Sequence, residues 1–141
     1  MAVASETGRL RTVLIHGPGG EVEQMTPSTA RELLYNEIVP IESVQREHRE
    51  LRDVLSLVAR TEEVTDILER IAAGPDGIAR LATGLSAGNG QVRERLLERW
   101  HNADPSSIRT DCICGVPRDP VRLVDVYRPS RYLIPPIPNL Y

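Results

Sequence analysis

Two cysteines and two histidines are the residues that could carry chemistry. Cys112 and Cys114 are separated by one residue, a spacing too tight for an ordinary structural disulfide and too sparse for a four-ligand zinc site. His101 and Asp111 lie nearby as further ligand candidates, but neither the count nor the spacing fits a closed metal site. We therefore expect reduced, structural thiols, no metal and no cofactor.

His48 falls in the apolar stripe of a predicted helix that begins after Pro40. The stripe recurs at intervals of three and four residues, through Ile41, Val44, His48, Leu51, Leu55 and Val58. The pattern predicts that this helix packs on a core. Because no nucleophile is paired with His48 in the sequence, we interpret it as a hydrogen-bonded histidine packed at a sheet surface, not as a ligand or a general base.

The elements that position these residues begin with a buried strand at 10–16, closed by the glycine-rich turn 17–20. The turn lacks the spacing and the Lys-Ser/Thr pair of a phosphate loop, and we expect no helix to open directly from it. A short helix is predicted over 26–35, with a Thr cap and Pro in its first turn. Residues 60–66 suit either a second strand or a continued helix.

A series of short helices separated by glycine and proline breakers follows, around 67–71, 78–85, 92–100 and 121–127. We expect Trp100 and His101 to pack and not to bind a ligand. The segment 132–141 is apolar and stiffened by proline, so it is predicted to be extended. So few strands leave open sheet edges, which a second polypeptide, a longer chain or self-association must cover.

Composition limits the function classes. The 141 residues are 40% apolar and 26% charged, which is typical of one globular domain. A net charge of −3 argues against nucleic acid or an anionic membrane as the main partner. Neither a membrane span nor a secretory signal is present in the sequence, so the expected location is cytoplasmic.

Four ordered segments resemble arginine deiminases. The first is Ser5-Glu-Thr-Gly-Arg-Leu-Arg-Thr-Val-Leu-Ile-His16 followed by Pro18-Gly19, and the others are 26–35, 45–48 and 133–141. They cover roughly the first third of the chain and its end. The helical middle is compatible with the helical insertion that such deiminases carry.

The resemblance implies an α/β fold: the first ββαβ-like unit of a pseudo-symmetric α/β propeller, with an inserted small helical bundle. On this basis we expect three parts. Residues 1–66 form the first propeller unit, 67–128 the helical insertion, and 129–141 an extended segment that returns to the propeller.

The resemblance also implies an activity, the hydrolysis of L-arginine to citrulline and ammonia by a Cys nucleophile with His, Glu and Asp. None of these catalytic residues lies in the matching part, because the family's Pro-Asn-Leu-Tyr segment, here Pro138 to Tyr141, leads into an Asp-bearing Phe-Thr-Arg-Asp motif that is absent. Two substrate-binding residues carry over, Leu34 near the arginine and Asn139 at its backbone end. Tyr35-Asn36-Glu37 replaces the family's Phe-Asp-Asp, so no acidic role is expected there.

The expected function is thus the N-terminal part of an arginine deiminase-like hydrolase, either a fragment or one subunit of a split enzyme. It would be inactive alone and would associate with a complementary C-terminal chain or with itself. Two alternatives stay open. One is a non-catalytic remnant that binds a protein partner through its strand edge and helices. The other is part of an amidinotransferase.

Overall fold

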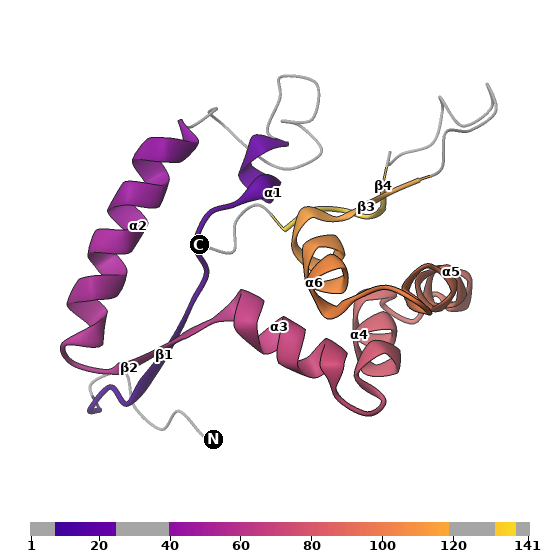
Figure 1. Ribbon diagram of the computed structural model, residues 1–141, viewed down its shortest axis with the longest axis horizontal. Helices are drawn as coiled ribbons and strands as arrows, with labels where there is room; N and C mark the ends of the chain where they lie inside the picture. Colours follow the sequence, from indigo (N-terminus) through magenta and orange to yellow (C-terminus); the bar gives the residue numbers. More distant parts are fainter. Residues whose placement is uncertain (1–7, 25–39, 119–131, 138–141) are drawn as a thin grey trace.

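The computed structural model describes residues 8–24, 40–118 and 132–137 (Figure 1). These residues combine helices with two small sheets, which confirms the mixed α/β class. In chain order the elements are β1 (Thr12–Ile15), α1 (Gly20–Glu23), α2 (Ile41–Ser56), β2 (Arg60–Glu63), α3 (Val64–Ala73), α4 (Gly77–Leu85), α5 (Gly90–Trp100), α6 (Pro105–Cys114), β3 (Val116–Pro117) and β4 (Tyr132–Ile134).

The strands β1 and β2 form a two-stranded parallel sheet, in which Ile15 lies beside Glu63. The segment 60–66 is therefore a strand that gives way to a helix. The helix α2 lies against one face of this sheet, where the hydroxyls of Ser56 and Thr61 are 3.3 Å apart. Because side chains alternate along a strand, Thr61 and Glu63 share the face on which α2 lies, and Leu14 points to the opposite face.

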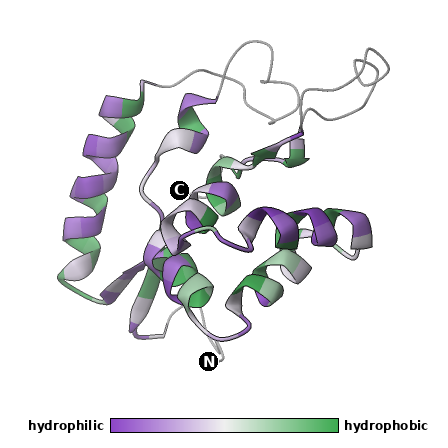
Figure 2. Ribbon diagram, turned by 45° about the vertical axis from the view of Figure 1, so that its right-hand side comes forward, coloured by the Kyte–Doolittle hydropathy of each residue, from purple (hydrophilic) through white to green (hydrophobic). Residues whose placement is uncertain are grey.

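The helix α2 forms as predicted after Pro40, but none of its 16 residues is buried. Leu51 and Val54 are 54% and 62% exposed, and Figure 2 shows that hydrophobic residues occur in the last turns of this helix. The expectation that this helix packs on a core is therefore wrong for the described residues. The reason is width: two strands about 4.8 Å apart cannot cover a helix about 10–12 Å across.

The main core lies among the helices α3 to α6 and a second sheet, formed by β3 and β4. This agrees with the predicted series of short helices. Trp100 is fully buried at its centre, whereas its neighbour His101 is exposed. The packing expected for Trp100 is confirmed and the packing expected for His101 is wrong. The buried members of the cluster are Ala72, Ala82, Leu96, Trp100, Ile108, Cys112, Val116 and Ile134.

The helix α6 is absent from the sequence prediction. Its buried positions do not form a regular apolar stripe, so hydrophobic periodicity gives little signal. Its start is nevertheless encoded, because Asp104 accepts hydrogen bonds from the backbone N–H groups of Ser106 and Ser107 and Pro105 occupies the first turn. The hydrogen bonds from both serines hold the pKa of Asp104 below its ordinary value.

A short helix, α1, opens directly from the glycine-rich turn, contrary to expectation. Its first turn is closed by the Val22 N–H, which donates to the Gly19 carbonyl at 3.0 Å. Val22 is buried, and α1 packs against α6. Tertiary packing thus stabilises a helical turn that begins at the poor helix former Gly20. The helices predicted over 26–35 and 121–127 lie outside the described residues.

The second sheet joins the end of the helical part to the described portion of the C-terminal segment. Val116 of β3 lies antiparallel beside Ile134 of β4, which confirms the extended conformation predicted there. Gly115 precedes β3 with φ of 78°, and a Cβ at this position would lie 2.5 Å from the Pro136 nitrogen. Only glycine tolerates both this dihedral angle and this approach.

The contacts of Asp111 generate a stability prediction. Its carboxylate accepts a hydrogen bond from the Trp100 indole at 2.8 Å and two from the Arg99 guanidinium at 2.6 and 3.0 Å. We expect Asp111→Ala to lower the free energy of unfolding by about 1–3 kcal/mol, because the indole N–H of Trp100 then lacks an acceptor. Urea unfolding measures this. Asp111→Asn retains an acceptor and serves as the control; an equal loss in both variants would contradict the role of the indole hydrogen bond.

Candidate functional site

A cluster of polar groups lies at the carboxyl ends of β1 and β2, the edge at which ligands bind in parallel α/β sheets. His16 follows β1 directly, and Glu63 is the last residue of β2. Between them runs the turn 17–20, which leads into α1. We call this group of side chains and the turn the carboxyl-edge cluster.

His16 and Glu21 form the buried centre of the cluster. Their side chains are 2% and 1% exposed, and the imidazole Nε2 lies 3.1 Å from the Glu21 Oε1. The same carboxylate oxygen accepts a hydrogen bond from the Gly19 N–H at 2.7 Å. Glu21 therefore connects the backbone of the glycine turn to the residue that follows β1.

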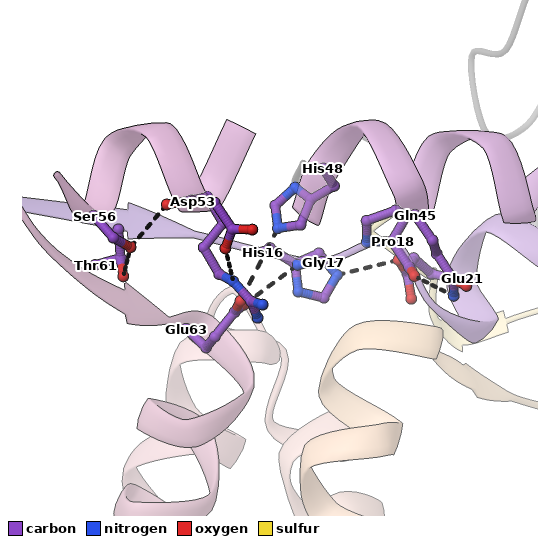
Figure 3. Close-up of polar contacts among 11 residues, drawn as sticks. His16, Gly17, Pro18, Glu21, Gln45, His48, Asp53, Ser56, Thr61 and Glu63 are labelled. Atoms are coloured by element: carbon purple, nitrogen blue, oxygen red, sulfur yellow. Dashed lines mark hydrogen bonds and ion pairs between the residues drawn. The ribbon is translucent and has the colours of Figure 1, made fainter. Parts of the chain in front are cut away.

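Groups from β2 and α2 hold the rest of the turn (Figure 3). The Gly17 N–H donates to the Glu63 carboxylate at 3.3 Å, and the Gln45 amide donates to the Pro18 carbonyl at 3.0 Å. His48 is packed at the sheet surface as predicted, with its Nε2 4.0 Å from the Glu63 Oε1. This distance is too long for a hydrogen bond, so the hydrogen-bonded state expected for His48 is wrong within the described residues.

The electrostatics of the cluster favour an ionised Glu21. Burial by itself raises the pKa of this carboxyl, but the hydrogen bonds from His16 and from Gly19, together with the charge interaction with His16, outweigh it. The net result is a pKa below the ordinary value of 4.5. Glu21 is thus a carboxylate that holds backbone, not a proton donor at neutral pH.

The two thiols are free, and both have raised pKa values. Burial, helped by the charge of Asp111, raises the pKa of Cys112 to about 11. Burial and the charge of Glu21 also raise the pKa of Cys114. Because the thiolate is the nucleophile, neither residue is suited to nucleophilic catalysis here, as the sequence analysis expects.

The amide of Gln24 connects the site region to the helical part. Its Nε2 donates to the Cys114 carbonyl at 2.9 Å, and its Oε1 accepts from the Tyr132 hydroxyl at 3.2 Å. Gln24 is the last described residue before the segment that carries Leu34. These two hydrogen bonds therefore fix the end of α1 relative to α6 and β4.

Both substrate-binding residues predicted from the resemblance, Leu34 and Asn139, lie outside the described residues. The structure instead brings together groups that the sequence analysis did not single out, chiefly Glu21, Glu63 and Gln45. The sequence offered one signal for Glu21, a carboxylate directly after a glycine turn, as in Gly20-Glu21. The long-range contacts of Glu63 and Gln45 left no local signal.

The described part of the chain contains neither a cluster of metal ligands nor a membrane-spanning helix. No three His, Cys, Asp or Glu side chains lie together there in a way that could hold a metal ion. None of the described helices has the length and apolar character needed to cross a membrane.

Comparison with known proteins connects the chain to one group of enzymes. The chain is 29% identical to an arginine deiminase of Pediococcus pentosaceus and 29% identical to one of Clostridium perfringens, each over 99% of its length. It is 26% identical to an arginine deiminase of Rhodococcus erythropolis, again over 99% of its length. The resemblance to arginine deiminases is confirmed. No family model matches the chain.

The match to the arginine deiminases also includes the helical middle, for which the sequence offered few motifs. The chain spans only about 37% of the length of the Pediococcus and Clostridium relatives. More than half of each relative therefore has no counterpart in these 141 residues.

The lowered pKa of Glu21 generates a pH prediction. A carboxyl group whose pKa is lower in the folded state stabilises the fold above its unfolded pKa, near 4.5, and loses this contribution as the pH falls through its folded value. We expect Glu21→Gln to reduce the free energy of unfolding by about 1–3 kcal/mol at pH 7 and by much less in acid. Urea unfolding between pH 7 and 3 measures the difference. Glu23→Gln, at an exposed position of the same helix, is the control, and a loss independent of pH would contradict this account.

The raised thiol pKa values generate a labelling prediction. At pH 8 a pKa of about 11 leaves Cys112 with roughly 100-fold less thiolate than the ordinary value of 9.0 would give. We expect a thiol reagent to label the folded chain slowly at both cysteines and to label the unfolded chain at the ordinary rate. Faster labelling of either cysteine in the folded chain than in the unfolded chain would contradict the structural role.

Proposed function

We propose that this chain is part of an arginine deiminase-like hydrolase, which converts L-arginine and water to L-citrulline and ammonia. The observation that carries the proposal is the match to arginine deiminases along essentially the whole chain. The carboxyl-edge cluster supports it, because buried Glu21 and the side chains of Glu63 and Gln45 hold a turn at the sheet edge where parallel α/β folds place ligands.

In the complete hydrolase, a Cys thiolate from the portion absent here attacks the guanidinium carbon of arginine. Ammonia then leaves, and water hydrolyses the thiouronium intermediate to citrulline and restores the thiol. The protonated, buried Cys112 takes no part in these steps. This chain contributes one wall of the pocket, with Leu34 beside the substrate and Asn139 at the amino-acid end of arginine.

A deiminase portion that lacks the nucleophile should be inactive by itself. We expect the purified chain to form no citrulline from arginine, and the complex with its complementary portion to form it. In that complex Asn139→Ala should raise KM about tenfold or more, because a hydrogen bond to a charged group contributes about 1.5–3 kcal/mol.

Colorimetric citrulline detection measures both effects, with Asn102→Ala, at an exposed position of the helical part, as the matched control. Activity of the isolated chain, or a complex that transfers the amidino group to an amine without releasing ammonia, would overturn the proposal. A chain that binds a partner with no deiminase activity in the complex would favour the non-catalytic remnant.

A further inference from the structure

A hollow of about 320 Å³ lies between α5 and the second sheet. One wall belongs to α5, and the other belongs to β3, to β4 and to the residue that follows β3. The lining combines apolar side chains of the sheet with four charged side chains. The hollow shares no residue with the carboxyl-edge cluster, and its volume suits a small molecule.

Positive charge prevails in this hollow, although the chain as a whole carries a net charge of −3. Arg95 and Arg99 lie one turn apart on α5, and Arg118 comes from the opposite wall. Glu98 is the one carboxylate that lines the hollow among the described residues. The Asp111 carboxylate already pairs with Arg99, whereas neither Arg95 nor Arg118 has an ion pair within the described part of the chain. Like charges gathered in this way repel one another, and an anion relieves that repulsion.

The Arg118 side chain also carries an unsatisfied donor. Its Nε is buried and has no hydrogen-bond partner. A buried donor without an acceptor destabilises a fold, so such a group in a native structure calls for an explanation such as a nearby ion. A guanidinium presents its Nε–H and a terminal N–H side by side, at a spacing that matches two oxygens of a carboxylate or a phosphate. An oxyanion in the hollow would therefore supply the acceptor that Arg118 lacks.

The placement of the arginines favours phosphate over carboxylate. A carboxylate holds its two oxygens in one plane and pairs with one guanidinium fork, whereas a tetrahedral phosphate directs its oxygens to several sides. Here the guanidinium groups come from two walls, α5 and the residue after β3. A phosphate group therefore bridges the two walls better than a single carboxylate does.

We propose that this hollow binds the phosphate group of a small phosphorylated molecule, with Arg95 and Arg118 as its principal donors. Arg99 adds a positive charge that its pair with Asp111 holds in place. Glu98 accepts a hydrogen bond from a hydroxyl or amino group elsewhere on the ligand, and the apolar side chains of β3 and β4 contact the remainder. The inference goes beyond the proposed function, because it assigns a ligand other than arginine to a different part of the chain.

The test titrates the purified chain with inorganic phosphate and with glycerol phosphate at constant ionic strength. The guanidinium Nε–H resonances in nitrogen–proton correlation spectra report binding at the site itself. We expect the Arg118 resonance to shift in a saturable way, with a dissociation constant of about 1 mM or lower for glycerol phosphate. Glutarate, a dicarboxylate, is the comparison ligand and should bind about tenfold more weakly or worse, because one carboxylate does not bridge the two walls.

Variants separate the site from general attraction of anions. Arg118→Gln and Arg95→Gln should each weaken glycerol phosphate binding about tenfold or more, because each removes a charged donor. Arg118→Lys keeps the charge but not the guanidinium fork, so it should recover only part of the affinity. The matched control, Arg80→Gln, removes one charge at an exposed position of α4 outside the hollow and should bind within about twofold of the wild-type chain. Thermal melts without phosphate establish that each variant folds, and the exposed Arg95 provides the test should Arg118→Gln fail to fold.

Three outcomes would overturn the inference. The first is a lack of saturable binding by both phosphate probes. The second is an equal loss of affinity in Arg80→Gln and Arg118→Gln, which would show attraction by net charge alone. The third is glutarate binding as tight as that of glycerol phosphate, which would remove the assignment to phosphate. None of these measurements involves citrulline formation, so their failure leaves the proposed function standing, and a failure of the proposed function leaves this site standing.

Discussion

The pairing of two parallel strands, with α2 in the connection between them, determines how apolar surface is distributed in the described part of the chain. Parallel neighbours need a long crossover connection, and α1 and α2 both lie in the connection from β1 to β2. Among the described residues the sheet is two strands wide, which gives α2 too little surface to bury its apolar stripe. The sheet face that carries Leu14 and the outer flank of α2 therefore stay open, while the helical part buries a core of its own.

The same strand geometry explains why the carboxyl-edge cluster is polar yet ordered. Parallel strands end at one edge, so the loop after β1 meets Glu63 of β2 there. A buried carboxylate such as Glu21 is costly unless it is hydrogen-bonded, and the His16 imidazole and Gly19 N–H supply those bonds. The buried Glu21 carboxylate would destabilise the fold if it had no partners. Here it holds the backbone of a glycine-rich turn.

The sequence predicts local elements well where hydrophobic periodicity is strong. The strand at 10–16, the helix after Pro40 and the helices near 67–100 follow from apolar spacing, and the structure confirms them. It fails for α6, whose buried residues follow no regular stripe and whose start depends on the Asp104 cap. It also fails for the packing of α2, because the stripe shows that a helix has an apolar face but not whether this chain covers it.

The candidate site residues show the same difference between local sequence patterns and long-range contacts. Leu34 and Asn139 come from a resemblance to whole enzymes, in which distant segments meet. The groups that the structure assembles, Glu63 on Gly17 and Gln45 on Pro18, are joined across 46 and 27 positions, which no local pattern encodes. The resemblance and the geometry thus identify different residues.

The division between a buried helical core and an open sheet has an energetic consequence. Ile15 is the only buried hydrophobic residue of the described β1, α2 and β2, so this region gains less from apolar burial than the cluster around Trp100. A partner that binds only the folded sheet stabilises it by mass action. Covering Leu14 and Leu51 would therefore contribute both to association and to the order of the edge that carries Glu21 and Glu63. Formation of the site therefore depends on the same narrow sheet that leaves these apolar side chains exposed.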